Sequence, residues 1–210
     1  MEQNKQRIVV KVGTSTLTHN SGALDLWSME HLVRTLADLQ GMGHEVILVS
    51  SGAIAVGTAK LGLSERPKEL RMKQAAAAVG QCRMMHIYDK FFSEYNRSMA
   101  QILLTGDDVE DPERAEHLSN TFSALLEMGV IPVVNENDSV SSAEIETGRH
   151  KVLGDNDTLS AIVAELCRAD LLVLLSDIDG LYDADPKTHP EAKLLHQVTE
   201  LTPEILEMAG

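Results

Sequence analysis

The stretch EVILVSSGAI, residues 45–54, is a short apolar run that ends abruptly in two serines and a glycine. A nearly continuous apolar run of strand length is typical of a strand buried on both faces, and such strands form parallel sheets covered by helices. Similar runs recur along the chain. They cover residues 8–12, 99–104, 130–134 and 171–175. Pro132 argues against a fully central place for its strand, because proline donates no hydrogen bond to a neighbouring strand.

Amphipathic segments separate these runs. Apolar spacing predicts helices over residues 29–39, 68–95, 113–128 and 157–167. Gly41 and Gly43 are expected to end the first helix and Gly129 the third, since glycine adopts the backbone conformation that follows a helix. Strands that alternate with helices indicate an α/β fold, with a parallel sheet between two helical layers. The polar stretch 139–153 interrupts the alternation, and we expect a hairpin or a mobile flap there.

The composition excludes several classes of function. The 210 residues include 32 Asp and Glu against 18 Lys and Arg, and this net charge of −14 argues against nucleic acid or an anionic membrane as a partner. Two cysteines are too few for a disulfide framework, no apolar run approaches the ~20 residues of a membrane span, and no signal peptide is visible. We therefore predict a cytoplasmic protein. The eight histidines lack metal-site spacing, so no metal bound directly by the protein is expected.

Polar and glycine residues cluster where the predicted strands end, at the edge where open parallel sheets bind ligands. Loop tips are generally polar, so the joint position of these clusters says more than any one of them. Four clusters follow strands, and they are residues 11–15 (KVGTS), 50–53 (SSGA), 135–138 (NEND) and 176–177 (SD). A fifth, residues 154–157 (GDND), opens a helix, and Asp157 is a candidate for the N-cap of that helix.

Lys11 ends a predicted strand and is followed closely by Gly13, Thr14 and Ser15. A lysine in this place can set its charge against a phosphate, while N–H groups of the loop hold the other oxygens. The spacing is not that of a Walker A motif. The structural alternative is a lysine that extends from the strand end into solvent.

Each of the other clusters also allows two interpretations. Gly52 can permit the close approach of a ligand to the start of a helix. The alternative is that a serine before Gly52 only caps that helix. Asn135 and Asp138 can bind an amino acid, because a protein carboxylate can bind the substrate ammonium and a protein amide can bind the substrate carboxylate. The alternative is that they form a turn rich in Asn and Asp. Asp177 can bind a ribose and Tyr182 can stack on a base, or their segment is a loop held by local turns.

Taken in order, the five clusters resemble the amino acid kinase family and, within it, the glutamate 5-kinases. The resemblance spans about residues 7–200, and residues 135–138 with 154–157 are the part specific to the glutamate 5-kinases. It implies a three-layer αβα sandwich with a mainly parallel sheet. It implies ATP-dependent phosphorylation of the L-glutamate γ-carboxylate to L-glutamyl 5-phosphate, the first step of proline biosynthesis. It further implies Mg²⁺ bound through the nucleotide, proline as a feedback inhibitor, and a homodimer or homotetramer.

The same resemblance assigns roles to residues of this chain. Lys11 would contact the transferred phosphoryl group as a catalytic residue, and Asp157 would orient the catalytic lysines. The expected substrate-binding residues are Ser51, Gly52, Ala53, Asn135, Asp138 and Asn156. The expected nucleotide-binding residues are Lys11, Gly13, Thr14, Ser15, Ser176, Asp177 and Tyr182.

The extent of the chain and two rival functions complete the expectations. Members of the family continue, beyond the position of Gly210, into a glycine-rich segment with a second active-site lysine. We therefore expect residues 1–210 to form an amino acid kinase domain that lacks its C-terminal nucleotide-binding section, which leaves the activity of this exact chain open. Residues 144–153 are expected to form a mobile loop that touches glutamate or a neighbouring subunit. The rivals are a kinase for acetylglutamate, aspartate or a nucleoside monophosphate, which residues 135–138 disfavour, and a non-catalytic glutamate or proline sensor.

Overall fold

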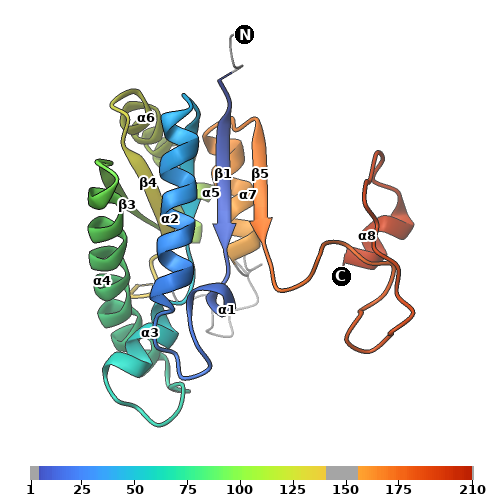
Figure 1. The fold of residues 1–210 in the computed structure, drawn as a ribbon, viewed down its shortest axis with the longest axis horizontal. Coiled ribbons are helices and arrows are strands. Elements are labelled where there is room, and N and C mark those ends of the chain that lie inside the picture. Colours follow the sequence, from blue (N-terminus) through green and yellow to red (C-terminus); the bar gives the residue numbers. More distant parts are fainter. Residues whose placement is uncertain (1–4, 141–155, 210) are drawn as a thin grey trace. The chain divides into compact units, whose positions relative to one another are not determined.

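The computed structural model describes residues 5–140 and 156–209 (Figure 1). The predictions for the loop 144–153, for most of the stretch 139–153, and for Gly154 and Asp155 concern residues outside these ranges. The chain divides into two compact units, Met1–Leu175 and Ser176–Gly210. Each unit is described by itself.

The first unit contains a five-stranded sheet. Its strands are β1 (Arg7–Val12), β2 (Glu45–Val49), β3 (Met99–Leu104), β4 (Ile131–Glu136) and β5 (Leu171–Leu175). They lie in the order β3-β4-β2-β1-β5, and each neighbouring pair is parallel (Figure 1). These strands match the five apolar runs, so the predicted parallel sheet is confirmed. Because all five point the same way, the polar segments that follow them meet at one edge.

Helices cover both faces of this sheet. In chain order they are α1 (Thr14–Leu17), α2 (Leu26–Gly41), α3 (Ala53–Lys60), α4 (Leu70–Glu94), α5 (Gly106–Glu110), α6 (Pro112–Glu127) and α7 (Asn156–Leu166). The predicted stop signals are confirmed, since Gly43 has φ of 97° just after α2 and Gly129 has φ of 71° just after α6. Asn156 is already helical, which places Asp157 inside the first turn of α7. The prediction that Asp157 is the N-cap is therefore wrong.

Two apolar cores separate the layers. One face of the sheet packs against α2, α3 and α4, whose largest buried side chains here include Tyr88 and Phe92. The other face packs against α6 and α7, where Phe122 and Leu159 are fully buried. In Figure 1, α2 and α4 accordingly lie in front of the strands and α7 behind them. The unit is a three-layer αβα sandwich, as expected.

Two strands differ from the simple pattern of burial. β5 is the most apolar strand, yet among the described residues it pairs only with β1, and Leu171 and Leu174 are 44% and 50% exposed. The expectation of a strand buried on both faces is thus wrong for β5. β4 lies between β3 and β2, but its pairing with β2 begins only at Val133. The missing N–H of Pro132 therefore interrupts no bond in that ladder.

Helices α3 and α4 cross at two glycines. A Cβ atom on Gly57 would lie 1.7 Å from the carbonyl oxygen of Ala76, and one on Gly80 would lie 1.8 Å from the carbonyl oxygen of Ala53. Neither position tolerates a side chain without movement of the backbone. This close crossing fixes the start of α3 against the middle of α4, beside the edge of the sheet where the strands end.

The second unit is largely irregular. It contains α8 (Pro203–Ala209) and an antiparallel bridge between Tyr182 and Leu194. Carboxylates hold its turns, since Asp183 accepts a 2.7 Å hydrogen bond from the backbone N–H of Lys193. In neither unit does a described helix combine the length and apolar character needed to cross a membrane.

Candidate active site

The site begins where β1 ends. The Lys11 ammonium lies 2.6 Å from a carboxylate oxygen of Asp157, in the first turn of α7. The Lys11 side chain is only 13% exposed, whereas that of Asp157 is 54% exposed. Lys11 is therefore held inside the edge of the sheet, and the alternative of a lysine that extends into solvent is wrong.

Two loops with glycines lie against each other beside this ion pair. Gly13 precedes α1, and a Cβ atom built on it would lie 3.7 Å from the Lys11 Nζ atom and 3.9 Å from the Ser15 hydroxyl. Gly52 has φ of 99°, a left-handed conformation that favours glycine, and its Cβ position lies 3.2 Å from the Thr14 methyl group. The structure thus brings the clusters 11–15 and 50–53 together, as predicted.

Two buried serines connect β2 to the same place. The Asn156 side-chain amide donates to the Ser51 hydroxyl and, at 3.3 Å, to the backbone carbonyl of Ser50. Gly52, not a serine, occupies the N-cap of α3, and no side chain caps that helix. The alternative of a capping serine is therefore wrong. We call Lys11, Gly13, Gly52, Asn156 and Asp157 the lysine side of the site.

Ser50 also contacts a buried, uncharged polar side chain of α4. The Ser50 hydroxyl lies 2.9 Å from the Tyr88 hydroxyl, and both residues are fully buried. Burial raises the pKa of the Tyr88 phenol well above its ordinary value, although the Ser50 hydrogen bond opposes this. Tyr88 consequently stays protonated and acts as a structural support for the loop after β2.

A second part of the site lies where β4 ends. The Asn135 amide, 2% exposed, donates a 2.9 Å hydrogen bond to the Gln81 side-chain carbonyl on α4. Asp138 follows in a turn and lines a small pocket at the edge of the sheet. The residues around this pocket are Ala53, Ala77, Gln81, Leu103, Glu136, Asn137, Asp138 and Ser139. We call Gln81, Asn135 and Asp138 the amide side of the site.

Gln81 was missed by the sequence reasoning. A signal for it exists, since it is a polar residue at helical spacing between the buried residues Ala77, Met84 and Tyr88 of α4. A polar side chain in the apolar stripe of a helix needs a partner inside the protein. Gln81 finds one such partner in Asn135.

The remaining predicted residues belong to the second unit and are described there. The Ser176 hydroxyl accepts a 3.4 Å hydrogen bond from the backbone N–H of Ile178. An oxygen of Asp177 lies 3.7 Å from the Lys187 ammonium. Tyr182 takes part in the bridge to Leu194. These contacts agree with the alternative of a locally stabilised loop and do not test nucleotide binding.

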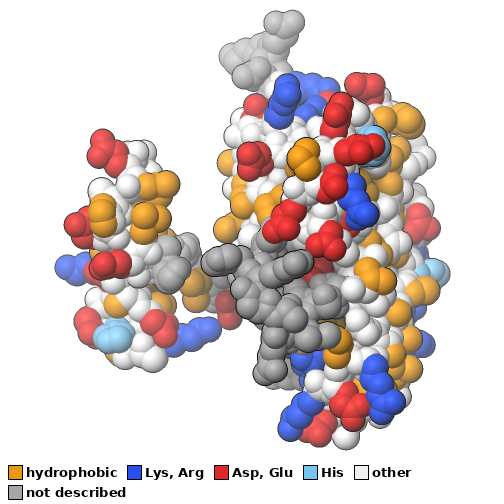
Figure 2. All heavy atoms as spheres, turned by 180° about the vertical axis from the view of Figure 1, so that it is seen from behind, with side chains coloured by type: hydrophobic (Ala, Val, Ile, Leu, Met, Phe, Trp, Pro, Cys, Tyr) orange, Lys and Arg blue, Asp and Glu red, His pale blue; other side chains and the backbone are white. Residues whose placement is uncertain are grey.

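The positive charge at the site is local. Figure 2 shows Asp and Glu side chains spread over one face of the first unit, with Lys and Arg side chains among them. Lys11 is largely withdrawn from solvent, where a charge acts more strongly than on the surface. Within the described ranges, His, Cys, Asp and Glu side chains form no group of three or more that could hold a metal ion.

The first unit is an α/β sandwich whose parallel strands bring charged and polar side chains to one edge of the sheet. Lys11 is largely withdrawn from solvent at the end of β1, and the amides of Gln81 and Asn135 lie with Asp138 near the end of β4. The chain belongs to the amino acid kinase family, whose sequence profile matches residues 6–209.

Relatives with curated names narrow this assignment. The chain is 54% identical over 208 residues to the glutamate 5-kinase of Clostridium perfringens, which covers 99% of this chain and 77% of that protein. It is 56% identical over 209 residues to the glutamate 5-kinase of Carboxydothermus hydrogenoformans, and this match covers 99% of this chain and 55% of that protein. The chain thus spans about three quarters of the first relative and about half of the second.

Solved structures support the fold alone. A UMP kinase from Ureaplasma parvum superposes with a TM-score of 0.60 at 16% identity, covering 99% of this chain and 86% of that one. The isopentenyl phosphate kinase of T. acidophilum gives a TM-score of 0.58 at 19% identity, with 90% and 77% covered.

Proposed function

We propose that this protein catalyses the ATP-dependent phosphorylation of the L-glutamate γ-carboxylate, giving L-glutamyl 5-phosphate, the first step of proline biosynthesis. The observation that carries the proposal is the identity of more than half of all residues, over nearly the whole chain, to curated glutamate 5-kinases. The two-sided site agrees with it, because phosphorylation of an amino acid needs a phosphate and an amino acid next to each other.

Lys11 supplies the charge for the transfer. A carboxylate oxygen of glutamate attacks the γ-phosphorus of ATP, and the bond from that phosphorus to the oxygen of ADP breaks. Such a transfer needs two anions brought together and the charge of the moving phosphoryl group neutralised, with little covalent help. Lys11 neutralises that charge, and Asp157 orients the ammonium of Lys11 through the 2.6 Å ion pair.

Magnesium fits this site as a companion of the nucleotide. The donors beside Lys11 are hydroxyls, amides and one carboxylate, which resembles the sparse protein contribution to Mg²⁺ sites rather than an all-protein cage. When bound to phosphate oxygens, Mg²⁺ offsets part of their negative charge.

The two sides of the site divide the remaining contacts. Asp138 binds the ammonium of glutamate, with Asn135, Ser51, Gly52, Ala53 and Asn156 around the substrate. Gly13, Thr14 and Ser15 bind phosphate oxygens next to Lys11. Ser176, Asp177 and Tyr182 bind the nucleotide, as expected for residues 1–210 of an amino acid kinase domain that lacks its C-terminal nucleotide-binding section.

Three wider properties complete the proposal. Proline acts as a feedback inhibitor, the enzyme assembles as a homodimer or homotetramer, and the reaction takes place in the cytoplasm. Cys82 and Cys167 are both free thiols. Burial raises the pKa of the Cys167 thiol to about 12, which makes this thiol inert.

A coupled assay of ADP release tests the proposal against its rivals. The acceptors are L-glutamate, L-aspartate, acetylglutamate and UMP, each with ATP and Mg²⁺. We expect turnover with glutamate and little with the others. Turnover of aspartate or UMP without turnover of glutamate would overturn the proposal. Glutamate binding by calorimetry without turnover of any acceptor would favour a sensor.

A further inference from the structure

Gln81 has one satisfied and one unsatisfied end. Its side chain is 7% exposed, and its carbonyl oxygen accepts the 2.9 Å hydrogen bond from Asn135. Its amide nitrogen is buried and has no hydrogen-bond partner among the described residues. A buried donor without a partner is unfavourable by about 1–3 kcal/mol, so an acceptor from a ligand or a water molecule would stabilise this side chain.

The position of Gln81 suggests what that ligand is. Gln81 lines the pocket at the end of β4 together with Asp138 and Ala53. Lys11, which faces the phosphoryl group, belongs instead to the end of β1. On the proposed function, glutamate has its γ-carboxylate at the lysine side and its α-ammonium and α-carboxylate at the amide side.

These two α-groups need opposite partners. The ammonium needs an acceptor, which Asp138 provides, and the carboxylate needs donors. The Asn135 amide already donates to Gln81. Among the described side chains that line this pocket, the buried donor without a hydrogen-bond partner is the amide of Gln81.

We propose that Gln81 binds the α-carboxylate of the acceptor amino acid through its side-chain N–H, and so makes the site select an amino acid over a simple amine. The inference rests on the proposed function and adds a specificity residue to it. Asn135 already occupies the Gln81 carbonyl, so the N–H end is the part of this side chain left to donate to a ligand.

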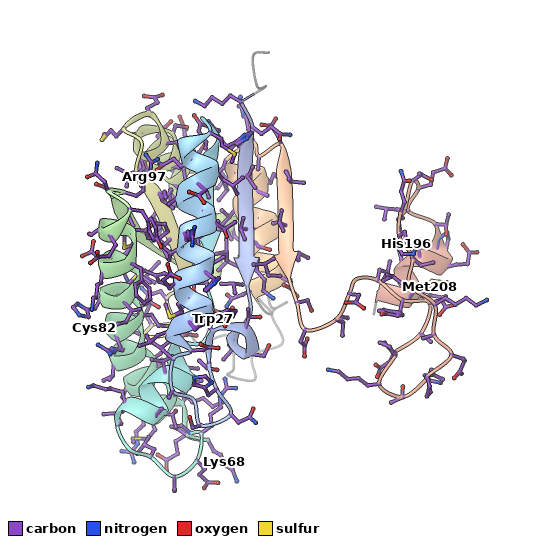
Figure 3. The ribbon with its side chains drawn as sticks, in the orientation of Figure 1. Trp27, Lys68, Cys82, Arg97, His196 and Met208 are labelled. Atoms are coloured by element: carbon purple, nitrogen blue, oxygen red, sulfur yellow. The ribbon has the colours of Figure 1, made fainter. Side chains whose placement is uncertain are left out.

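The decisive variant is Gln81→Glu. It keeps the shape and the oxygen that accepts from Asn135, but it replaces the donor with a second oxygen that repels a carboxylate. Gln81→Met removes both polar ends and serves if the first variant does not fold. Cys82→Ser is the matched control, because Cys82 is the next residue of α4 and is exposed on the outer side of that helix (Figure 3).

Two inhibitors separate the groups of glutamate. Glutarate keeps the second carboxylate and lacks the ammonium, whereas 4-aminobutyrate keeps the amine and lacks the α-carboxylate. In Gln81→Glu we expect the glutamate KM and the glutarate inhibition constant to rise about 10- to 100-fold, as for loss of a hydrogen bond to a charged group. The 4-aminobutyrate inhibition constant and the ATP KM change less than about threefold. Cys82→Ser matches the wild type throughout.

The outcomes separate the two proposals. A wild-type protein that neither binds nor phosphorylates glutamate refutes the proposed function. A wild-type enzyme that phosphorylates glutamate, with an unchanged glutamate KM in folded Gln81→Glu and Gln81→Met, refutes the role of Gln81 alone. An equal loss for glutarate and 4-aminobutyrate would also refute it, because Gln81 would then only shape the pocket. Circular dichroism and the Tm establish folding in each case.

Discussion

The lysine side and the amide side of the site are built from different chemistry. The lysine side rests on an ion pair between a nearly buried ammonium and a half-exposed carboxylate. The amide side rests on two neutral amides that are 93% or more withdrawn from solvent. A charge stabilises developing negative charge at a distance, whereas buried amides read the shape and the hydrogen bonds of a ligand. The first arrangement suits the chemical step and the second suits selection of the substrate.

Removing Lys11 tests the lysine side and should have the largest effect. In Lys11→Ala we expect kcat to fall about 10³-fold, since one donor to a developing charge is commonly worth 10²–10³ in rate. The glutamate KM should change less than about threefold, because the amide side is intact. Steady-state kinetics measure both. Lys60→Ala is the control, as Lys60 is an exposed lysine at the end of α3. A raised KM with normal kcat would contradict the division.

Removing Asp138 tests the amide side, where we expect a change in the glutamate KM and not in kcat. In Asp138→Ala we expect the glutamate KM to rise about 30-fold, since the substrate ammonium loses its charged acceptor. The ATP KM should remain within about twofold, because on the proposed function this carboxylate faces the amino acid and not the nucleotide. Initial rates at varied glutamate and ATP check this. A normal glutamate KM would count against the ammonium-binding role.

The lysine side was easier to predict than the amide side. Lys11 lies near the end of β1, and Gly13 and Gly52 follow strands whose apolar runs are visible in the sequence. Parallel strands bring such residues to one edge. The Gln81–Asn135 bond joins residues from α4 and β4, and only the packing of α4 over the sheet determines it. The exposure of β5 could not be predicted either, because an apolar run indicates a strand but not how many strands pair with it.

The glycine crossing of α3 and α4 offers a structural test of the amide side. In Gly80→Ala the new methyl group must displace the carbonyl of Ala53, so we expect a loss of about 1–3 kcal/mol in the free energy of unfolding. The shift should also raise the glutamate KM more than it lowers kcat, since Ala53 and Gln81 line the same pocket. Urea unfolding and kinetics measure the two effects.

Gly41→Ala is the control for this variant. Gly41 is the last residue of α2, and the nearest atom to its Cβ position is the flexible end of Arg97 at 3.1 Å. Its stability should remain within about 0.5 kcal/mol of the wild type. Equal losses in the two variants would show that the crossing is not specially tight.

The smallest expected effect concerns a helix beside the amide side. Asp108 lies in α5, directly after β3, and exchanges hydrogen bonds with Thr105 in a capping box. The Thr105 hydroxyl, the Thr105 N–H and Arg114 hold the pKa of Asp108 below its usual 3.8, against the opposing effect of burial. A lowered pKa in the folded state means that the unfolded chain binds the proton more tightly. The stabilisation is therefore complete above pH 3.8 and is lost as the pH falls through the lower folded value.

Asp108→Asn separates this cap from the rest of the protein. At pH 7 we expect the variant to be about 1 kcal/mol less stable, because a charged carboxylate accepts stronger hydrogen bonds than a neutral amide. At about pH 3 the difference should shrink, because the wild-type carboxylate is then partly protonated. Asp107→Asn is the control, since Asp107 is exposed in the same turn and should show no such convergence. Urea unfolding of the three proteins at both pH values measures it. A constant difference between Asp108→Asn and the wild type would mean that the shape of the side chain, and not its charge, stabilises α5.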